Sequence, residues 1–201
     1  MEAGGVSSRL AVFGYASLVS PASAAQTLGR AVDPVVPARL TGFARCWTLA
    51  RDNLRSEKTF ARPDGSLPRF CVGLTIEADP SAEPPNGALI EVTEAELERL
   101  DLREIRYHRI AVTDAVAADP PSARPFAAVF AYRVRPEHHY PDPPEDAVLI
   151  ASYARAVEGA FADLGPGQLE LFRRTTRPVG VELTEASLVR DRIPAGNPRD
   201  W

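Results

Sequence analysis

The stretch that decides the fold lies near the start of the chain, at residues 12–18, and reads VFGYASL. The apolar residues at 9–13 predict a strand, which the glycine ends. A strand that ends in glycine and small residues leaves backbone N–H groups unpaired, and such a turn can hold a carboxylate or a developing oxyanion. An ordinary tight turn before a helix explains the same pattern. This candidate binding turn, the 14–18 turn, consists of Gly14, Tyr15, Ala16, Ser17 and Leu18.

Outward from the turn, helix and strand patterns follow one another irregularly. Ser20 followed by proline predicts a helix start, and Gly29 predicts its end. Thr93 and Glu96 match a capping box, which predicts a second helix up to about Glu104. The patterns predict strands at 9–13, 38–49, 70–77, 88–92, 106–115 and 126–135, with further helices at 146–164 and up to about 174. Because strands and helices do not alternate regularly, we expect an α+β fold.

One carboxylate stands out on the second predicted helix. Glu104 lies four residues after Leu100 and seven after Leu97, so it falls on the apolar stripe of that helix. A carboxylate on a buried face is costly unless it is paired, and burial raises a carboxyl pKa toward the range that suits a general base. Spacing alone leaves a structural explanation open, in which Glu104 pairs with an arginine or the helix ends one turn early. The candidate partners are Arg103, Arg106 and Arg109.

Charge and length limit the classes of function. The chain has 201 residues, of which 23 are Lys or Arg and 27 are Asp or Glu, so its net charge is −4. This balance argues against nucleic acid as the main partner, because phosphate binding needs a positive excess. The length and the 45% hydrophobic content predict one globular domain over residues 1–201.

Cysteine use and hydropathy indicate the compartment. Cys46 and Cys71 are the only cysteines and form no C-x-x-C pattern, so we expect no disulfide framework and a reducing compartment. Acidic residues around His138 are better explained as a solvated loop than as a metal site. The apolar run at residues 10–19 resembles a signal peptide, but glycine, tyrosine and serine interrupt it. No apolar stretch reaches the roughly 18 residues of a membrane span, so we expect a cytoplasmic protein without membrane contact.

Several short motifs together resemble the gamma-glutamylcyclotransferase family, including its ChaC-like, glutathione-acting branch. The family opens with a strand running into Y-G-S-L, or F-G-Y-G-S-L in that branch, and residues 13–18 read FGYASL. Its second signature is a helix that ends in a leucine-rich turn with a catalytic glutamate, then a tyrosine and a strand. Here residues 100–107 read LDLREIRY, and RIAV follows at 109–112. GFARCW at 42–47 and NGAL at 86–89 match further family strands, in the family's order, over roughly the first 135 residues.

This resemblance implies a compact mixed β-barrel of about six strands with flanking helices and a cavity at the barrel mouth. It implies an enzyme, a gamma-glutamylcyclotransferase of lyase or transferase type, that closes a gamma-glutamyl group to 5-oxoproline and releases an amine or peptide. Glu104 would be the single catalytic residue, and the 14–18 turn and Tyr107 would bind the small-molecule substrate. The reaction requires no metal and no organic cofactor.

The match departs from the family pattern at three places. Ala16 stands where the family usually has glycine, so a backbone angle or a close approach to substrate differs. Residues 51–69 form a long polar stretch with a hairpin tip at 62–65, which we expect near the cavity mouth, and residues 190–201 lie outside the resemblance. Two alternatives stay open: an enzyme of the same fold that acts on a gamma-glutamyl-amine or sugar amide, and a non-catalytic small-ligand binding protein.

Overall fold

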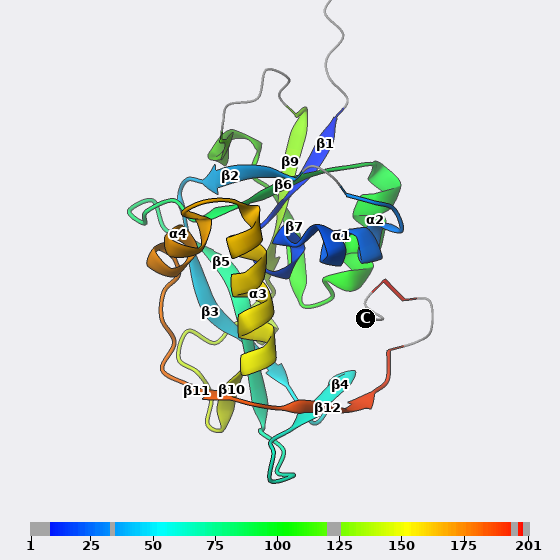
Figure 1. The fold of residues 1–201 in the computed structure, drawn as a ribbon, viewed down its shortest axis with the longest axis vertical. Helices are drawn as coiled ribbons and strands as arrows, with labels where there is room; N and C mark the ends of the chain where they lie inside the picture. Colours follow the sequence, from blue (N-terminus) through cyan, green and yellow to red (C-terminus); the bar gives the residue numbers. More distant parts are fainter. Residues whose placement is uncertain (1–8, 33–34, 120–125, 194–196, 199–201) are drawn as a thin grey trace, which may run out of the picture.

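The fold combines strands and α-helices over residues 9–32, 35–119, 126–193 and 197–198, which the structure, a computed structural model, describes (Figure 1). The strands are β1 (Leu10–Gly14), β2 (Val36–Leu40), β3 (Phe43–Asp52), β4 (Lys58–Ala61), β5 (Phe70–Ala78), β6 (Asn86–Val92), β7 (Tyr107–Ala111), β8 (Val116–Ala118), β9 (Ala128–Val134), β10 (Ala147–Ile150), β11 (Glu182–Thr184) and β12 (Ser187–Asp191). The helices are α1 (Pro21–Leu28), α2 (Glu94–Arg103), α3 (Ala151–Leu164) and α4 (Gln168–Thr175), with short 3-10 turns η1 (Ser17–Val19), η2 (Thr113–Ala115) and η3 (Pro136–His138). The predicted α+β class is therefore confirmed.

The strands form three sheets in the part of the chain that is described. One has the order β7-β9-β1-β6-β2-β8, the second β11-β10-β5-β3, and the third pairs β12 with β4. The compact mixed β-barrel of about six strands is therefore replaced by several mixed sheets, which do not close into a barrel among the described strands. Where β5 meets β9, the Val134 N–H donates to the Thr75 side-chain hydroxyl at 2.9 Å. At this junction of the two larger sheets, a side-chain hydroxyl accepts the hydrogen bond of a strand N–H.

Local capping signals correctly locate the first two helices. The Ser20 hydroxyl accepts a hydrogen bond from the Ser23 N–H in front of α1, and Gly29 ends that helix with φ +74°. Thr93 and Glu96 form both hydrogen bonds of the capping box at the start of α2. The entry into α2, the helix that leads to Glu104, is therefore set by contacts within four residues.

Three predicted elements are divided in the structure. The strand expected at 38–49 becomes β2 and β3, because Gly42 turns the chain with φ +82°. The helix expected at 146–164 begins only at Ala151, since residues 147–150 form β10 and pair in parallel with β5 and β11. The strand expected at 106–115 ends after β7, and η2 and β8 follow it. The polar stretch 51–69 contains an unexpected strand, β4.

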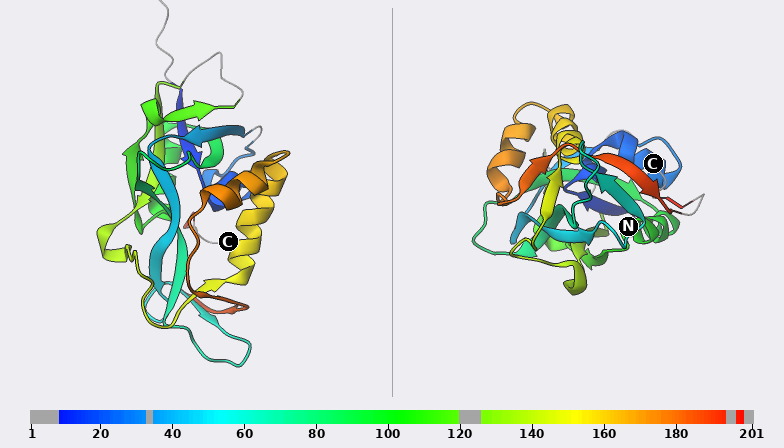
Figure 2. Two further views of the ribbon diagram at one scale, coloured as in Figure 1. Left: turned by 90° about the vertical axis from the view of Figure 1, so that its left-hand side faces the viewer. Right: turned by 90° about the horizontal axis from the view of Figure 1, so that it is seen from below.

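The large sheet is buried on both faces near β1. Phe13 packs in the larger core cluster, which also contains Leu74 of β5 and Phe161 of α3. Val12, one residue earlier, points into the second cluster together with Leu100 of α2. Figure 2 shows α3 and α4 on one side of the long strands β3 and β5. Packing on both faces holds β1 in place, and with it the turn at its end.

Candidate active site

Two adjoining hollows lie at the end of β1. The inner chamber has a volume of about 50 Å³ and the outer cleft about 620 Å³. Ser17, Glu104, Tyr107 and Tyr153 line both. The inner chamber is lined by Phe13, Gly14, Tyr15, Ala16, Ser17, Leu18, Leu74, Glu104, Tyr107, Tyr132 and Tyr153. The structure therefore brings every site residue predicted from the sequence to one chamber.

The 14–18 turn is closely packed, and Gly87 on the strand beside it leaves no room for a side chain. A Cβ atom on Gly14 would lie 3.0 Å from the Leu18 Cβ, and one on Gly87 of the neighbouring β6 would lie 2.3 Å from the Gly14 carbonyl oxygen. Ala16 has φ −139°, so its backbone needs no left-handed conformation. Alanine at this position therefore causes no strain of φ, and its methyl group lies at the chamber wall.

Glu104 lies directly after the last residue of α2, not within the helix as the spacing predicted. Its N–H donates to the Leu100 carbonyl at 2.8 Å, and its own carbonyl accepts from the Tyr107 N–H at 2.8 Å. The side chain is 17% exposed, and one carboxylate oxygen lies 3.1 Å from the Arg103 Nε. The proposed pairing with a neighbouring arginine is therefore present, while the same carboxylate faces the chamber.

Arg103 was predicted only as a possible partner of Glu104, and its contacts with α1 and the 14–18 turn were not predicted. Its guanidinium is buried and donates to the Ser23 hydroxyl at 3.0 Å, to Thr27 Oγ1 at 2.5 Å and to the Ser17 hydroxyl at 3.1 Å. It thus joins Glu104, the helix α1 and the 14–18 turn. Arg103 lies three residues after Leu100, on the apolar stripe of Leu97 and Leu100. This spacing is the sequence feature that indicates a buried position for its side chain.

The chamber walls carry uncharged hydroxyl groups around Glu104. Burial and then the Glu104 charge raise the pKa of Tyr15 well above its usual value, and the same two causes raise the pKa of Tyr153 to about 12. Burial also raises the pKa of Tyr107, whose hydroxyl donates to the Leu74 carbonyl at 2.8 Å. At neutral pH these tyrosines are therefore protonated, and Glu104 is the acid among the residues that line the chamber.

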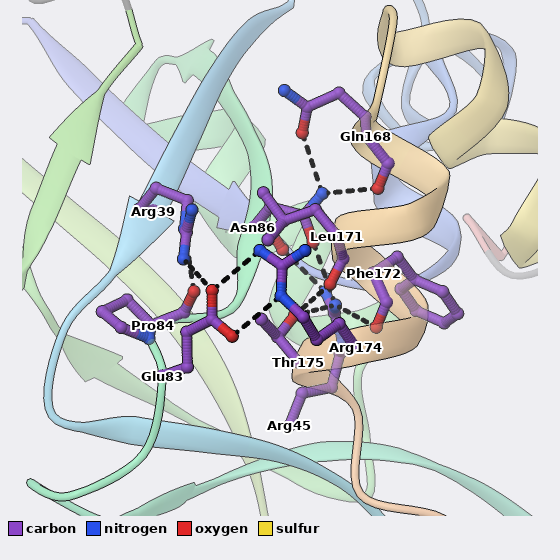
Figure 3. A network of polar contacts seen from close by, with 10 residues as sticks. All are labelled: Arg39, Arg45, Glu83, Pro84, Asn86, Gln168, Leu171, Phe172, Arg174 and Thr175. Atoms are coloured by element: carbon purple, nitrogen blue, oxygen red, sulfur yellow. Dashed lines mark hydrogen bonds and ion pairs between the residues drawn. The ribbon is translucent and has the colours of Figure 1, made fainter.

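A second buried arginine supports the turn from behind. Arg45 of β3 is fully buried and donates to the carbonyl oxygens of Asn86 at 2.6 Å and Tyr15 at 3.3 Å. It also donates to the Phe172 carbonyl at 3.2 Å and to the Thr175 hydroxyl at 3.1 Å, both on α4 (Figure 3). Burial lowers the pKa of Arg45 to about 9, so it still carries its charge at neutral pH. The sequence placed Arg45 only within the GFARCW motif.

The outer cleft contains part of the polar stretch 51–69. Arg51, Glu57, Lys58 and Phe60 line it, whereas the tip at 62–65 does not. The expectation that this stretch lies near the cavity mouth therefore holds for its first half. Among the described residues, no group of three His, Cys, Asp or Glu side chains could hold a metal ion, and no helix is long and apolar enough to cross a membrane.

Comparisons with known proteins bear on the fold. No family model matches the sequence, and no curated protein matches it. Among solved structures, one described as gamma-glutamyl cyclotransferase matches at 15% identity and TM-score 0.56 over 88% of this chain and 94% of that one. The uncharacterized human protein LOC79017 matches at 15% identity and TM-score 0.54, over 89% of this chain and 95% of its own. YkqA of Bacillus subtilis matches at 17% identity and TM-score 0.53, over 83% of this chain but only 53% of YkqA.

These matches show a gamma-glutamylcyclotransferase-like fold over most of the chain. The resemblance inferred from the sequence motifs is thereby confirmed for the fold. At this level of identity they show nothing about substrate or catalysis.

Proposed function

We propose that this chain is a gamma-glutamylcyclotransferase, which closes a gamma-glutamyl group to 5-oxoproline and releases an amine or peptide. One observation carries the proposal. The Glu104 carboxylate, held by Arg103, lies where the inner chamber adjoins the outer cleft. In this proposal the glutamyl head of the substrate occupies the chamber and the leaving group extends into the cleft. The reacting carbonyl then lies at the junction, within reach of the Glu104 carboxylate.

The proposed reaction is an internal aminolysis. The free α-amine of the gamma-glutamyl group attacks the carbonyl carbon of its own side-chain amide, so a new C–N bond closes the five-membered ring. Glu104 takes a proton from the attacking nitrogen and delivers it to the leaving nitrogen as the old C–N bond breaks. The products are 5-oxoproline and the free amine, and no external reactant is consumed.

The chamber residues have complementary roles in this proposal. Backbone N–H groups of the 14–18 turn would hold the substrate carboxylate or the oxyanion. A volume of about 50 Å³ corresponds to about four water-sized groups, the scale of an amino-acid head group. Confinement there would fold the substrate into its cyclising conformation and so supply proximity. Tyr107, which lines the same chamber, would also contact the glutamyl head.

The chemistry uses protein side chains and backbone alone, so we propose that the enzyme needs neither metal nor organic cofactor. Two buried thiols without a disulfide fit a reducing compartment, and we place the enzyme in the cytoplasm.

The test is direct detection of 5-oxoproline after incubation with a panel of gamma-glutamyl compounds, glutathione among them. Glu104→Gln keeps the volume of the side chain but cannot accept the amine proton. We expect it to remain folded and to lose about 10²–10⁴ in rate. Turnover near the wild-type rate in Glu104→Gln would remove Glu104 from the mechanism. Calorimetric binding without any 5-oxoproline would favour the alternative of a non-catalytic binding protein.

A further inference from the structure

The far wall of the outer cleft carries a cation that the proposed chemistry does not use. Resting on the proposed function, we infer that Arg51 determines specificity by binding a carboxylate on the leaving amine. Conjugates whose leaving group lacks this carboxylate would lose the contact with Arg51 and be poorer substrates.

Strand register places Arg51 beyond the inner chamber. On β3 and β5, Leu49 pairs with Gly73 and Arg51 pairs with Cys71, so Arg51 and Leu49 share one face of the sheet. A Cβ atom on Gly73 would lie 3.9 Å from the Tyr107 hydroxyl, which marks the chamber end of this face. Two residues along a strand cover about 7 Å. Arg51 therefore lies on the path of a leaving group that runs from Glu104 along the cleft.

Arg51 differs from the other cations of the cleft in its partners. Arg106 forms a two-pronged ion pair with Glu57 at 2.9 and 2.5 Å, and Lys58 lies 3.6 Å from Asp191. Arg51 donates to neutral acceptors, the Ser56 hydroxyl at 2.7 Å and the Lys58 carbonyl, and it forms no ion pair with any carboxylate of the described residues.

A cation in this setting favours an incoming anion. The Arg51 guanidinium lies over the Phe60 ring at 5.3 Å, and burial lowers its pKa, because water solvates the charge poorly there. The Glu57 charge acts on Arg51 without forming an ion pair with it, so a carboxylate that enters the cleft would supply a direct counter-charge and charge-assisted hydrogen bonds. A polyamine conjugate would bring free ammonium groups and be repelled. A simple alkylamine conjugate, whose amide nitrogen is neutral, would offer Arg51 no charged partner.

The lining of the outer cleft as a whole is mostly apolar. The apolar side chains that line it include Leu49, Phe60, Val72, Ile105, Ile150 and Ala156. The expected leaving group thus combines an apolar body with an acidic end.

A matched pair of substrates tests the inference. Gamma-glutamyl-leucine and gamma-glutamyl-isopentylamine differ only in the carboxylate of the leaving group. We expect the wild-type protein to favour the leucine conjugate by about 10- to 100-fold in kcat/KM. Arg51→Met should remove that preference by lowering kcat/KM for the leucine conjugate alone. Arg51→Lys should retain part of it, and Arg55→Met, on the exposed neighbouring turn, should retain all of it.

Each outcome supports or overturns the inference. Equal kcat/KM for the two substrates in the wild-type protein would overturn it while leaving the proposed function standing, and so would an equal loss on both substrates in Arg51→Met. Should Arg51→Met fail to fold, the wild-type comparison and Arg51→Lys still decide. Absence of 5-oxoproline from every compound would instead defeat the proposed function and this inference with it.

Discussion

Glu104 and Arg103 are neighbours in the chain, yet the end of α2 gives them different surroundings. Arg103 is the last helical residue and turns into the protein, where α1 and the 14–18 turn supply its acceptors. Glu104 follows the helix, and its carboxylate reaches both the chamber and the Arg103 guanidinium. A buried arginine with several partners has a fixed position, so it can hold a neighbouring carboxylate in one orientation.

Arg103→Lys should separate positioning from binding. A lysine ammonium is a point charge and cannot reach Glu104, Ser17 and α1 at once, so the carboxylate loses its fixed direction. We expect kcat for 5-oxoproline formation to fall by about 10- to 100-fold, with a smaller change in KM. Arg99→Lys is the matched control, because Arg99 donates to the Thr27 carbonyl of α1 and does not touch Glu104. An equal loss of kcat in both variants would contradict a positioning role.

Substitutions of Ala16 test whether the 14–18 turn binds the substrate. Since φ at Ala16 is −139°, Ala16→Gly relieves no strain of φ and should leave kcat/KM unchanged or raise it modestly. Ala16→Val places a stiff, branched side chain in a chamber of about 50 Å³ and should abolish binding. Calorimetry on the three proteins measures the affinity. Binding by Ala16→Val as tight as that of the parent would show that the turn does not hold the substrate.

At the scale of the elements, α2 leads directly to the candidate base Glu104, and the first turn of α2 fixes where the helix begins. Glu96 completes the capping box and forms a two-pronged ion pair with Arg30 at 2.5 and 3.1 Å. Burial acts to raise the pKa of Glu96, but hydrogen bonds from Arg30 and from the Thr93 N–H outweigh it and hold the pKa below its usual value. These bonds attach the start of α2 to the segment after α1.

Glu96→Gln should therefore cost stability in a pH-dependent way. Because the folded pKa is lowered, the ionised carboxylate contributes stability above its usual pKa of 4.5, and the contribution disappears as pH falls through the folded value. We expect a loss of about 1 kcal/mol at pH 7 that shrinks in acid, measured by urea unfolding at several pH values. Glu98→Gln, exposed on the same helix, is the control. A loss of stability that is independent of pH would contradict the assignment of this contribution to the ionised Glu96 carboxylate.

At the scale of the whole molecule, Arg45 connects parts of the chain that are far apart in sequence. Its donors reach the turn after β1, the start of β6 and the end of α4, as Figure 3 shows for Asn86 and α4. Its guanidinium also lies 4.2 Å from the centre of the Phe172 ring. The partners are neutral, so satisfied hydrogen bonds and ring contacts stabilise this buried charge.

Arg45→Lys should destabilise the whole fold. A lysine has three donors on a flexible stem, so several buried carbonyl and hydroxyl acceptors would lose their partners. We expect a loss of about 2 to 4 kcal/mol in the free energy of unfolding, measured by urea denaturation. Arg39→Lys, at the exposed ion pair with Glu83 in the same region (Figure 3), should cost less than about 1 kcal/mol. Equal losses in the free energy of unfolding for Arg45→Lys and Arg39→Lys would show that the buried contacts of Arg45 add no stability.

The sequence alone determined the features that depend on near neighbours. The caps at Ser20 and Thr93 and the stop at Gly29 were predicted correctly, because each rests on hydrogen bonds or a backbone angle within a few residues. The order of the motifs at 13–18 and 100–107 also indicated the fold that the structural matches confirm.

Only the tertiary structure decided which distant segments meet. Residues 147–150 carry a helix-compatible sequence but become β10, because β5 and β11 offer backbone partners on both sides. The pairing of the strands into three sheets, and the hydrogen bond from the Val134 N–H to the Thr75 hydroxyl between two of them, likewise join segments far apart in the chain. The surroundings of Glu104 also depend on residues far away in the chain, because its partner Arg103 is held by Ser17 and Ser23. Burial and pairing between remote segments outweigh local preference, and a local pattern contains no information about them.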